Sequence, residues 1–157
     1  MVQQIKADKD YILLTTIMQV SGILFKIRER ELLPQNLSAT AAEILFLVDA
    51  MDENVTPAKI SRMVLHETQS VSGILIRMEE HGLIKRTRDM ERKNHIRITL
   101  TAKGKKALKQ VMKLEGTTGI LSRLSTDQRK QLKTILMALK EIGKKELNLS
   151  PKALLWP

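Results

Sequence analysis

Apolar residues recur at helical spacing over most of the chain, and this pattern is interrupted once by a predicted two-stranded hairpin. A long helix is predicted from about Asp8 to Glu31, ending before Pro34. Its apolar positions form more than one narrow stripe, so we expect it to pack against its own chain and against a second surface. These positions are Ile12, Leu13, Ile17, Val20, Leu24 and Ile27.

A second helix is predicted from about Ser38 to Met51. Either Ser38 or Thr40 is suited to cap it, and the spacing from Thr40 to Glu43 fits a capping box. Its buried face is expected to consist of Ile44, Leu45, Leu47 and Val48.

Two shorter helices separated by a tight turn are predicted next. The first opens at Thr56-Pro57, an N-cap followed by proline at the first helical position. A break at His66-Glu67 leads to Thr68, the N-cap candidate of the following helix. That helix stops at Gly82, where a left-handed residue commonly ends a helix. The expected core positions of the two helices are Ile60, Met63, Val64, Val71, Leu75 and Met78.

The chain ends in helical sequence. Thr101 is suited to cap a helix that begins AKGKKALKQVMKL, and Gly116 and Gly119 weaken that helix near its end. A last helix starts at Ser125, with Gln128 at capping-box spacing. Its regular apolar face consists of Leu132, Ile135, Leu136, Leu139 and Ile142. Because both terminal regions carry surplus apolar surface, we expect them to interlock with a second copy of the chain.

Positive charge is concentrated around the predicted hairpin. The net charge of the 157 residues is +10, and the segment from His81 to Lys113 holds eleven basic and two acidic residues. A local basic patch is the footprint of phosphate binding, because each neutralised phosphate releases condensed counterions. By itself the patch also fits a solvated surface, but it follows a helix pair suited to a DNA groove.

Composition excludes several classes of protein. Cysteine is absent, which removes disulfides, thiolate metal sites and cysteine-based peroxide sensing. The four aromatic residues are too few for base-stacking platforms. His66, His81 and His95 form no ligand cluster, and no catalytic motif is present, so we expect no metal, no cofactor and no enzyme activity. We find no signal peptide pattern and no apolar run of membrane-spanning length, which favours a cytoplasmic protein without membrane contact.

The stretch from Thr56 to Leu108 resembles the multiple-antibiotic-resistance regulator (MarR) family of transcription regulators. HGLIKR is similar to the family's passage from recognition helix into wing, and ITLTAKG to its closing strand and following helix. The flanking helices also lie where that family has its dimerisation helices. The resemblance implies a mainly α fold with a small β-hairpin wing: a winged helix-turn-helix over residues 37–101, an N-terminal dimerisation helix over 1–36 and C-terminal dimerisation helices over 102–157.

The same resemblance implies a homodimer that binds double-stranded DNA at a pseudo-palindromic operator, commonly as a repressor, and often releases it on binding a small-molecule effector. The recognition helix would be Thr68 to His81 and the wing tip Asp89 to His95. Two features depart from the family: the tip has the sequence DMERKNH, and Gly73 stands where a larger polar or basic residue is usual.

The expected DNA-binding residues lie on this helix and on the wing. Gln69 is suited to pair with adenine, and serines serve as donor or acceptor. Arg77 is expected at a phosphate or an intramolecular partner, and Arg92 and Lys93 are expected in the minor groove or at a phosphate. The full set is Thr68, Gln69, Ser70, Ser72, Gly73, Arg77, Arg88, Arg92, Lys93 and Asn94. The alternative function is a winged-helix interaction module whose basic wing binds an acidic protein partner.

Overall fold

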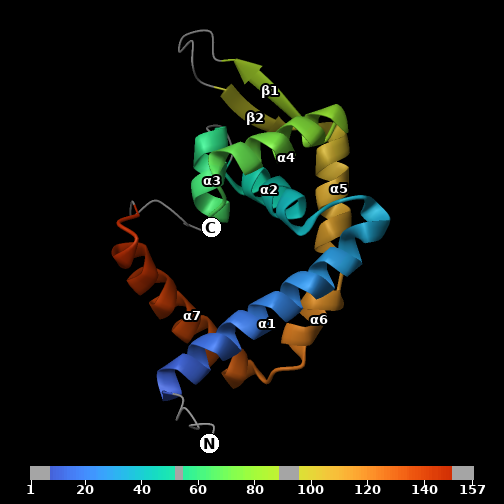
Figure 1. Cartoon of the computed structure of the whole chain (residues 1–157). Coiled ribbons are helices and arrows are strands. Elements are labelled where there is room, and N and C mark those ends of the chain that lie inside the picture. Colours follow the sequence, from blue (N-terminus) through green and yellow to red (C-terminus); the bar gives the residue numbers. More distant parts are fainter. Residues whose placement is uncertain (1–7, 52–54, 89–95, 150–157) are drawn as a thin grey trace, which may run out of the picture.

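The computed structural model describes residues 8–51, 55–88 and 96–149. It is mainly helical with one antiparallel hairpin, as the sequence predicts (Figure 1). The elements are α1 (Lys9–Leu32), the 3-10 turn η1 (Leu33–Gln35), α2 (Ala39–Ala50), α3 (Pro57–Val64), α4 (Thr68–Glu80), β1 (Ile84–Arg88), β2 (Ile96–Leu100), α5 (Ala102–Met112), α6 (Gly116–Ser122) and α7 (Thr126–Glu146).

The hydrophobic core lies around α2, whose apolar side chains are buried on several sides. Ile44, Leu45 and Leu47 are fully buried, in agreement with the sequence pattern. Helices α3, α4 and α5 and strand β2 pack around this helix. The predicted core residues of α3 and α4 are all buried too: Ile60, Met63, Val64, Val71, Leu75 and Met78. Ser38 is the N-cap of α2, where its hydroxyl accepts from the Ala41 N–H, so the Thr40 alternative is wrong.

The turn between α3 and α4 differs from the prediction at one residue. Helix α4 begins with Thr68 itself, and its N-cap is Glu67, which makes no side-chain capping bond. The Thr68 hydroxyl instead lies 3.4 Å from the hydroxyl of Ser61, which donates to the His66 carbonyl at 2.6 Å. Because Ser61 is almost fully buried, it ties the turn to the core and draws the Thr68 hydroxyl toward α3.

The hairpin is held against α4 and α5 by the chain around Leu83. Strands β1 and β2 pair antiparallel with Ile84 opposite Leu100. Thr101 donates its hydroxyl to the Gly82 carbonyl and accepts from the Gly104 N–H, so it caps α5 while holding the end of α4. Gly82 has φ +69°, the left-handed conformation expected after the helix. The hairpin is therefore fixed at its base by backbone geometry.

The last turn of α1 is joined to two other helices by carboxylates. Glu29 accepts from the backbone N–H of Ala39 at the start of α2. Glu31 accepts from the backbone N–H of Gly116 at 2.5 Å and from the Thr117 hydroxyl. The sequence suggested one helix weakened near Gly116; the chain instead ends α5 at Met112 and begins α6 at Gly116, where Glu31 satisfies the free N–H.

Helices α1 and α7 expose most of the large apolar side chains that the folded chain leaves in contact with solvent. Of the 21 such residues among those described, nine lie in α1 and six in α7. Figure 1 shows α7 projecting away from the body that α2, α3, α4 and α5 form. This exposure agrees with the expected surplus of apolar surface on both terminal regions.

The expectation that the chain holds no apolar run of membrane-spanning length is wrong. Helix α1 with its following turn, Lys9–Gln35, is long and apolar enough to cross a membrane by length and composition, with a mean hydropathy of 1.3 in its most apolar window. A soluble helix with an uncovered apolar face meets the same criterion, so this is weak evidence for a membrane span.

Candidate nucleic-acid interface

Helix α4 presents a polar outer face beside the hairpin. Gln69, Ser70 and Arg77 are exposed, whereas Val71, Leu75 and Met78 anchor the opposite face in the core. Figure 1 shows α4 and the hairpin together at the end of the molecule remote from α6. Of the predicted DNA-binding residues, the structure therefore brings these three to one free surface.

Two predicted contact residues of α4 have hydroxyls engaged within the protein. The Ser72 hydroxyl donates to the Thr68 carbonyl at 2.9 Å, and the Thr68 hydroxyl lies beside Ser61. A hydroxyl in this state keeps lone pairs as acceptors but has no proton left for a base acceptor. The freer polar groups at this end of α4 are those of Gln69 and Ser70.

Gly73 leaves the middle of the outer face of α4 without a side chain. A Cβ placed there would meet no heavy atom within 4 Å, so the position faces open space. No contact within the protein requires glycine at this position. Its backbone is open to close approach by a ligand from outside.

Ile76 belongs to this surface although the sequence analysis did not select it. It is 43% exposed, and at 100° per residue it lies on the same side of the helix as Gln69 and Gly73. An exposed aliphatic side chain on a groove-entering helix suits the methyl group of thymine. The signal was present in the spacing of seven from Gln69, but the sequence analysis assigned Ile76 neither to the core nor to the DNA-binding face.

The recognition helix and the wing are braced by an ion pair. Glu79 near the end of α4 accepts from the Arg86 side chain at 2.6 Å and from the Arg86 backbone N–H at 2.9 Å. The Arg86 backbone and side-chain hydrogen bonds hold the pKa of Glu79 below its ordinary value. Arg86 is therefore used within the protein, while Arg88 at the end of β1 is exposed and makes no ion pair with a described residue.

The wing tip lies outside the described residues. Arg92, Lys93 and Asn94 are among the predicted contacts, and the suggested pairing of Asp89 with a wing arginine is also there. Strands β1 and β2 lead directly to this segment, and Arg88 stands at its border. These contacts stay predictions.

A second feature is a pocket of about 470 Å³ where α1, α2 and α5 meet. Its walls are largely apolar, with Leu24, Phe25, Phe46 and Leu108 among them, and it also holds two charged groups, Arg28 and Glu43. Burial raises the pKa of Glu43, against a smaller opposing effect of His66. Arg28 also pairs with Glu31 at 3.0 Å. The size and the lining of this pocket are those of a small-molecule site.

Metal-binding side chains do not gather in threes or more anywhere within residues 8–51, 55–88 and 96–149. The predicted absence of a metal site stays a prediction. The features that the structure does assemble are the polar face of α4, the braced wing and the apolar pocket.

Comparison with known proteins gives one family. The model of the MarR family matches residues 35–93, which run from η1 into the wing. The organic hydroperoxide resistance transcriptional regulator of Bacillus subtilis (strain 168) is 33% identical over 89 residues, which are 57% of this chain and 60% of that protein. The match thus spans less than two thirds of this curated relative.

Solved structures extend the similarity to the flanking helices. The organohalide-sensing regulator RdhR, in a form with bound 2,4-dichlorophenol, is 27% identical with a TM-score of 0.77, covering 87% of this chain and 82% of that one. A mutant MarR of E. coli in complex with operator DNA is 18% identical with a TM-score of 0.74, covering 85% of this chain and 99% of that one, a likeness of fold alone. Over residues 35–93 in sequence, and over most of its length in fold, the chain is similar to the MarR family of winged-helix transcriptional regulators.

Proposed function

We propose that this chain is a homodimeric regulator that binds a pseudo-palindromic DNA operator, acts as a repressor and responds to a small-molecule effector. The observation that carries the proposal is the polar, uncovered face of α4 held beside a basic wing by the Glu79–Arg86 pair. A winged helix-turn-helix of this kind inserts its second helix into the major groove. Such a regulator acts in the cytoplasm.

Dimerisation is supported by the surface that the protomer leaves uncovered. A folded monomer of 17.9 kDa exposes about 8,000 Å², whereas this chain exposes 12388 Å². The apolar part is concentrated on α1 and α7, so residues 1–36 and 102–157 serve as the dimer layer around the DNA-binding lobe of residues 37–101. Two recognition helices related by a two-fold axis would meet successive major grooves about 34 Å apart.

The DNA contacts divide into base and backbone contacts. Gln69 and Ser70 are proposed to contact base edges, with Ile76 on a thymine methyl, and the Gly73 backbone approaches the groove closely. Arg77 and Arg88 are proposed to meet phosphates. Arg92, Lys93 and Asn94 at the wing tip extend the contact to the adjacent minor groove, where arginine suits a narrow width. Thr68 and Ser72 contribute as acceptors or through the backbone, because their hydroxyl protons are engaged or directed inward.

The effector is proposed to enter the pocket between α1, α2 and α5. This position joins the dimer layer to the DNA-binding lobe, so an occupant that spreads α1 from α2 changes the separation of the two recognition helices. The lining by Leu24, Phe25 and Phe46 supports a small apolar ligand. Thiol oxidation is not available as a signal, since these 157 residues contain no cysteine.

The test is duplex binding at one fixed salt concentration, using DNA from the regulator's own promoter region and a random duplex. Gln69→Ala should weaken operator binding by about 1–3 kcal/mol if the amide pairs with a base, and should leave random-duplex binding nearly unchanged. Replacing Arg92 and Lys93 by alanine should weaken both duplexes and lower the salt slope by about 0.9 for each lost phosphate contact.

The contrary outcomes are distinct. An equal loss on both duplexes for Gln69→Ala would show that this residue contacts only the backbone. A wild-type protein that binds neither duplex at low salt would favour the alternative, a module whose basic wing binds an acidic protein. Release of the operator by added 2,4-dichlorophenol, the ligand of the RdhR structure, provides a first probe of the effector pocket.

A further inference from the structure

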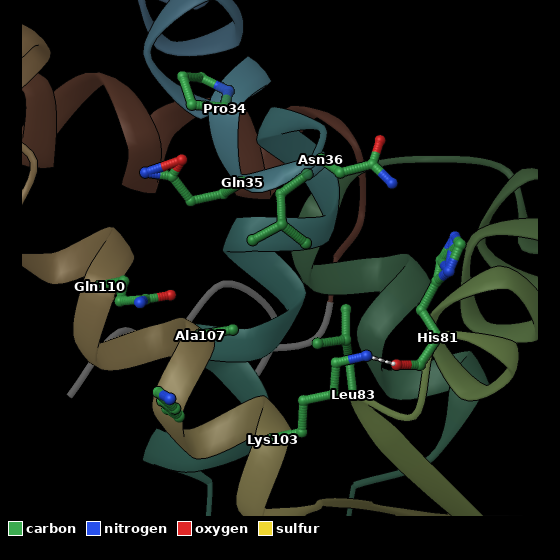
Figure 2. A pocket seen from close by; sticks show the side chains of 10 residues that line it. Pro34, Gln35, Asn36, His81, Leu83, Lys103, Ala107 and Gln110 are labelled. Carbon is green, nitrogen blue, oxygen red and sulfur yellow. Dashed lines mark hydrogen bonds between the residues drawn. The ribbon is translucent and has the colours of Figure 1, made fainter.

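A second cavity lies on the flank of the DNA-binding lobe, apart from the apolar pocket. Its volume is about 690 Å³, and it is lined by η1 and the two residues that follow it, by the turn after α4 and by α5. This volume is in the range of small-molecule sites. Figure 2 shows Gln35 and Gln110 on one side of it and His81 and Lys103 on the other. The two cavities share no lining residue.

The chemistry of this lining is basic and polar. The ten residues include Lys103, Lys106 and His81 and no aspartate or glutamate. Lys106 makes no ion pair with any residue in the described part of the chain. Lys103 donates one proton to the His81 carbonyl at 2.7 Å, which Figure 2 marks, and an ammonium group retains two further donors. Positive charge without a counterion in a concave site attracts small anions.

Gln35 adds an unsatisfied polar atom at the same cavity. Its Oε1 is buried without a hydrogen-bond partner among the described residues. Because this oxygen has almost no accessible surface, an occupant reaches it only when the amide turns toward the cavity. An unpaired buried polar atom costs about 1–3 kcal/mol, which favours that turn when the occupant carries a hydrogen-bond donor. The requirement for a donor is independent of the requirement for negative charge that the lysines impose.

The walls are positioned before any ligand arrives. Gly104 packs so closely that a Cβ there would lie 2.0 Å from the Leu83 carbonyl oxygen, which fixes α5 against the end of α4. On the other side, the Leu37 N–H donates to the Leu32 carbonyl and holds the turn of η1. A preformed site loses less entropy when a ligand binds.

We infer that this cavity binds a small, multiply charged organic anion that also carries a hydroxyl group, through Lys103, Lys106 and Gln35. The site is separate from the proposed effector pocket and does not depend on that proposal. Because Lys103 also bonds the C-terminal carbonyl of the recognition helix, an anion held there would act on the end of α4 directly. The same lysines would suit a phosphate of the DNA backbone, and the experiment separates these two sources.

The probe is citrate, which has three carboxylates and one hydroxyl, compared with tricarballylate, which lacks only the hydroxyl. Binding to the full chain is measured by calorimetry at constant ionic strength. Lys106→Gln should weaken citrate binding about fivefold or more. Lys105→Gln removes the same charge from α5 at a residue outside the lining. This control should change the affinity for citrate less than about twofold.

Gln35 is tested by the difference between the two probes. The wild-type protein should bind citrate more tightly than tricarballylate, and Gln35→Leu should remove that difference. The inference is overturned if neither probe binds saturably, or if Lys105→Gln and Lys106→Gln lose citrate affinity equally. It is also overturned if Lys106→Gln weakens duplex binding more than Lys105→Gln does while citrate binding is unchanged, since the lysine then meets a DNA phosphate.

Discussion

The Glu79 carboxylate accepts two hydrogen bonds from Arg86, one from the Arg86 side chain and one from the Arg86 backbone N–H. These bonds join the recognition helix to the first strand of the wing. The two residues are seven apart, with the turn at Gly82 between them. The backbone bond fixes the start of the strand, and the 2.6 Å ion pair fixes its direction relative to the helix. This carboxylate therefore adds to the backbone contacts around Leu83 in holding the helix and the wing relative to each other.

Glu79→Gln should destabilise the fold by about 1 kcal/mol, because the charge-assisted bonds are lost from side chains that are about one third exposed. It should also weaken DNA binding, since the wing is no longer held at one angle. The measurements are thermal unfolding and duplex affinity. Glu80→Gln changes the same charge at the next residue, which is exposed, and serves as the control. Equal effects from both variants would contradict the brace.

The pH dependence of this contact follows from the lowered pKa of Glu79. A carboxyl whose folded pKa lies below its unfolded value adds stability above the unfolded value and loses it as the pH falls through the folded one. The gap in melting temperature between wild type and Glu79→Gln should thus be full above pH 4.5 and should close in more acidic solution. A gap that persists in strong acid would exclude the ion pair as its source.

Gly73→Ala should separate stability from function. Its Cβ would enter open space, and alanine is preferred to glycine inside a helix by about 0.5–1 kcal/mol, so the melting temperature should rise by about 2–4 °C. Operator binding should fall, because the added methyl group stands where the groove is proposed to approach the backbone. Unchanged operator affinity in the stabilised variant would mean that this face of α4 does not approach DNA closely.

Gly104→Ala is the matched change in α5 and should act in the opposite direction on stability. The Cβ would lie 2.0 Å from the Leu83 carbonyl oxygen, and that oxygen belongs to the backbone. Relief requires α5 to move from the base of the hairpin, which we expect to cost at least about 1–3 kcal/mol. Chemical denaturation of the two variants side by side measures the contrast, and a wild-type midpoint for Gly104→Ala would contradict the packing described.

Glu43→Gln should stabilise the protein near neutral pH. Burial raises the pKa of Glu43, so its ionised form is unfavourable in the folded chain. The stability associated with the neutral carboxyl is present below the ordinary value of 4.5 and is lost as the pH rises through the raised folded value. The stabilising effect of glutamine should therefore be largest above that range and disappear in acid. Asp49→Asn, an exposed change on the same helix, is the control for thermal unfolding at both pH values.

Ile135→Asp combined with Leu139→Asp should prevent dimerisation while leaving the protomer folded. These side chains are 57% and 45% exposed in the protomer, so charging them costs its core little. Light scattering should give twice 17.9 kDa for the wild type and the single mass for the variant. Thr134→Asp adds one negative charge, half that of the double variant, away from this apolar face of α7 and should stay dimeric. A wild-type mass of one chain at micromolar concentration would exclude the dimer.

Local patterns were sufficient for most of the fold. The positions of α1, α2, α3 and α4 follow from apolar periodicity, from Ser38 and Thr56 as caps, and from Gly82 as a terminator, all of which act within a few residues. The core residues of α3 and α4 were predictable for the same reason: a helix with one apolar face has one way to bury it. The concentration of positive charge around the hairpin was also evident from the sequence, although charge by itself also fitted a solvated surface.

Tertiary structure decided the rest, because the deciding contacts join residues far apart in the sequence. Thr68 is suited to be a cap by its residue type, but the buried Ser61 draws its hydroxyl inward and Glu67 takes the cap position. The end of α5 could not be located from Gly116 alone, since the carboxylate that accepts from its N–H is Glu31, 85 residues away. Ile76 is apolar, yet the packing leaves it exposed on the outer face of α4. The sequence determines which faces are apolar; only the fold determines which of them stay uncovered.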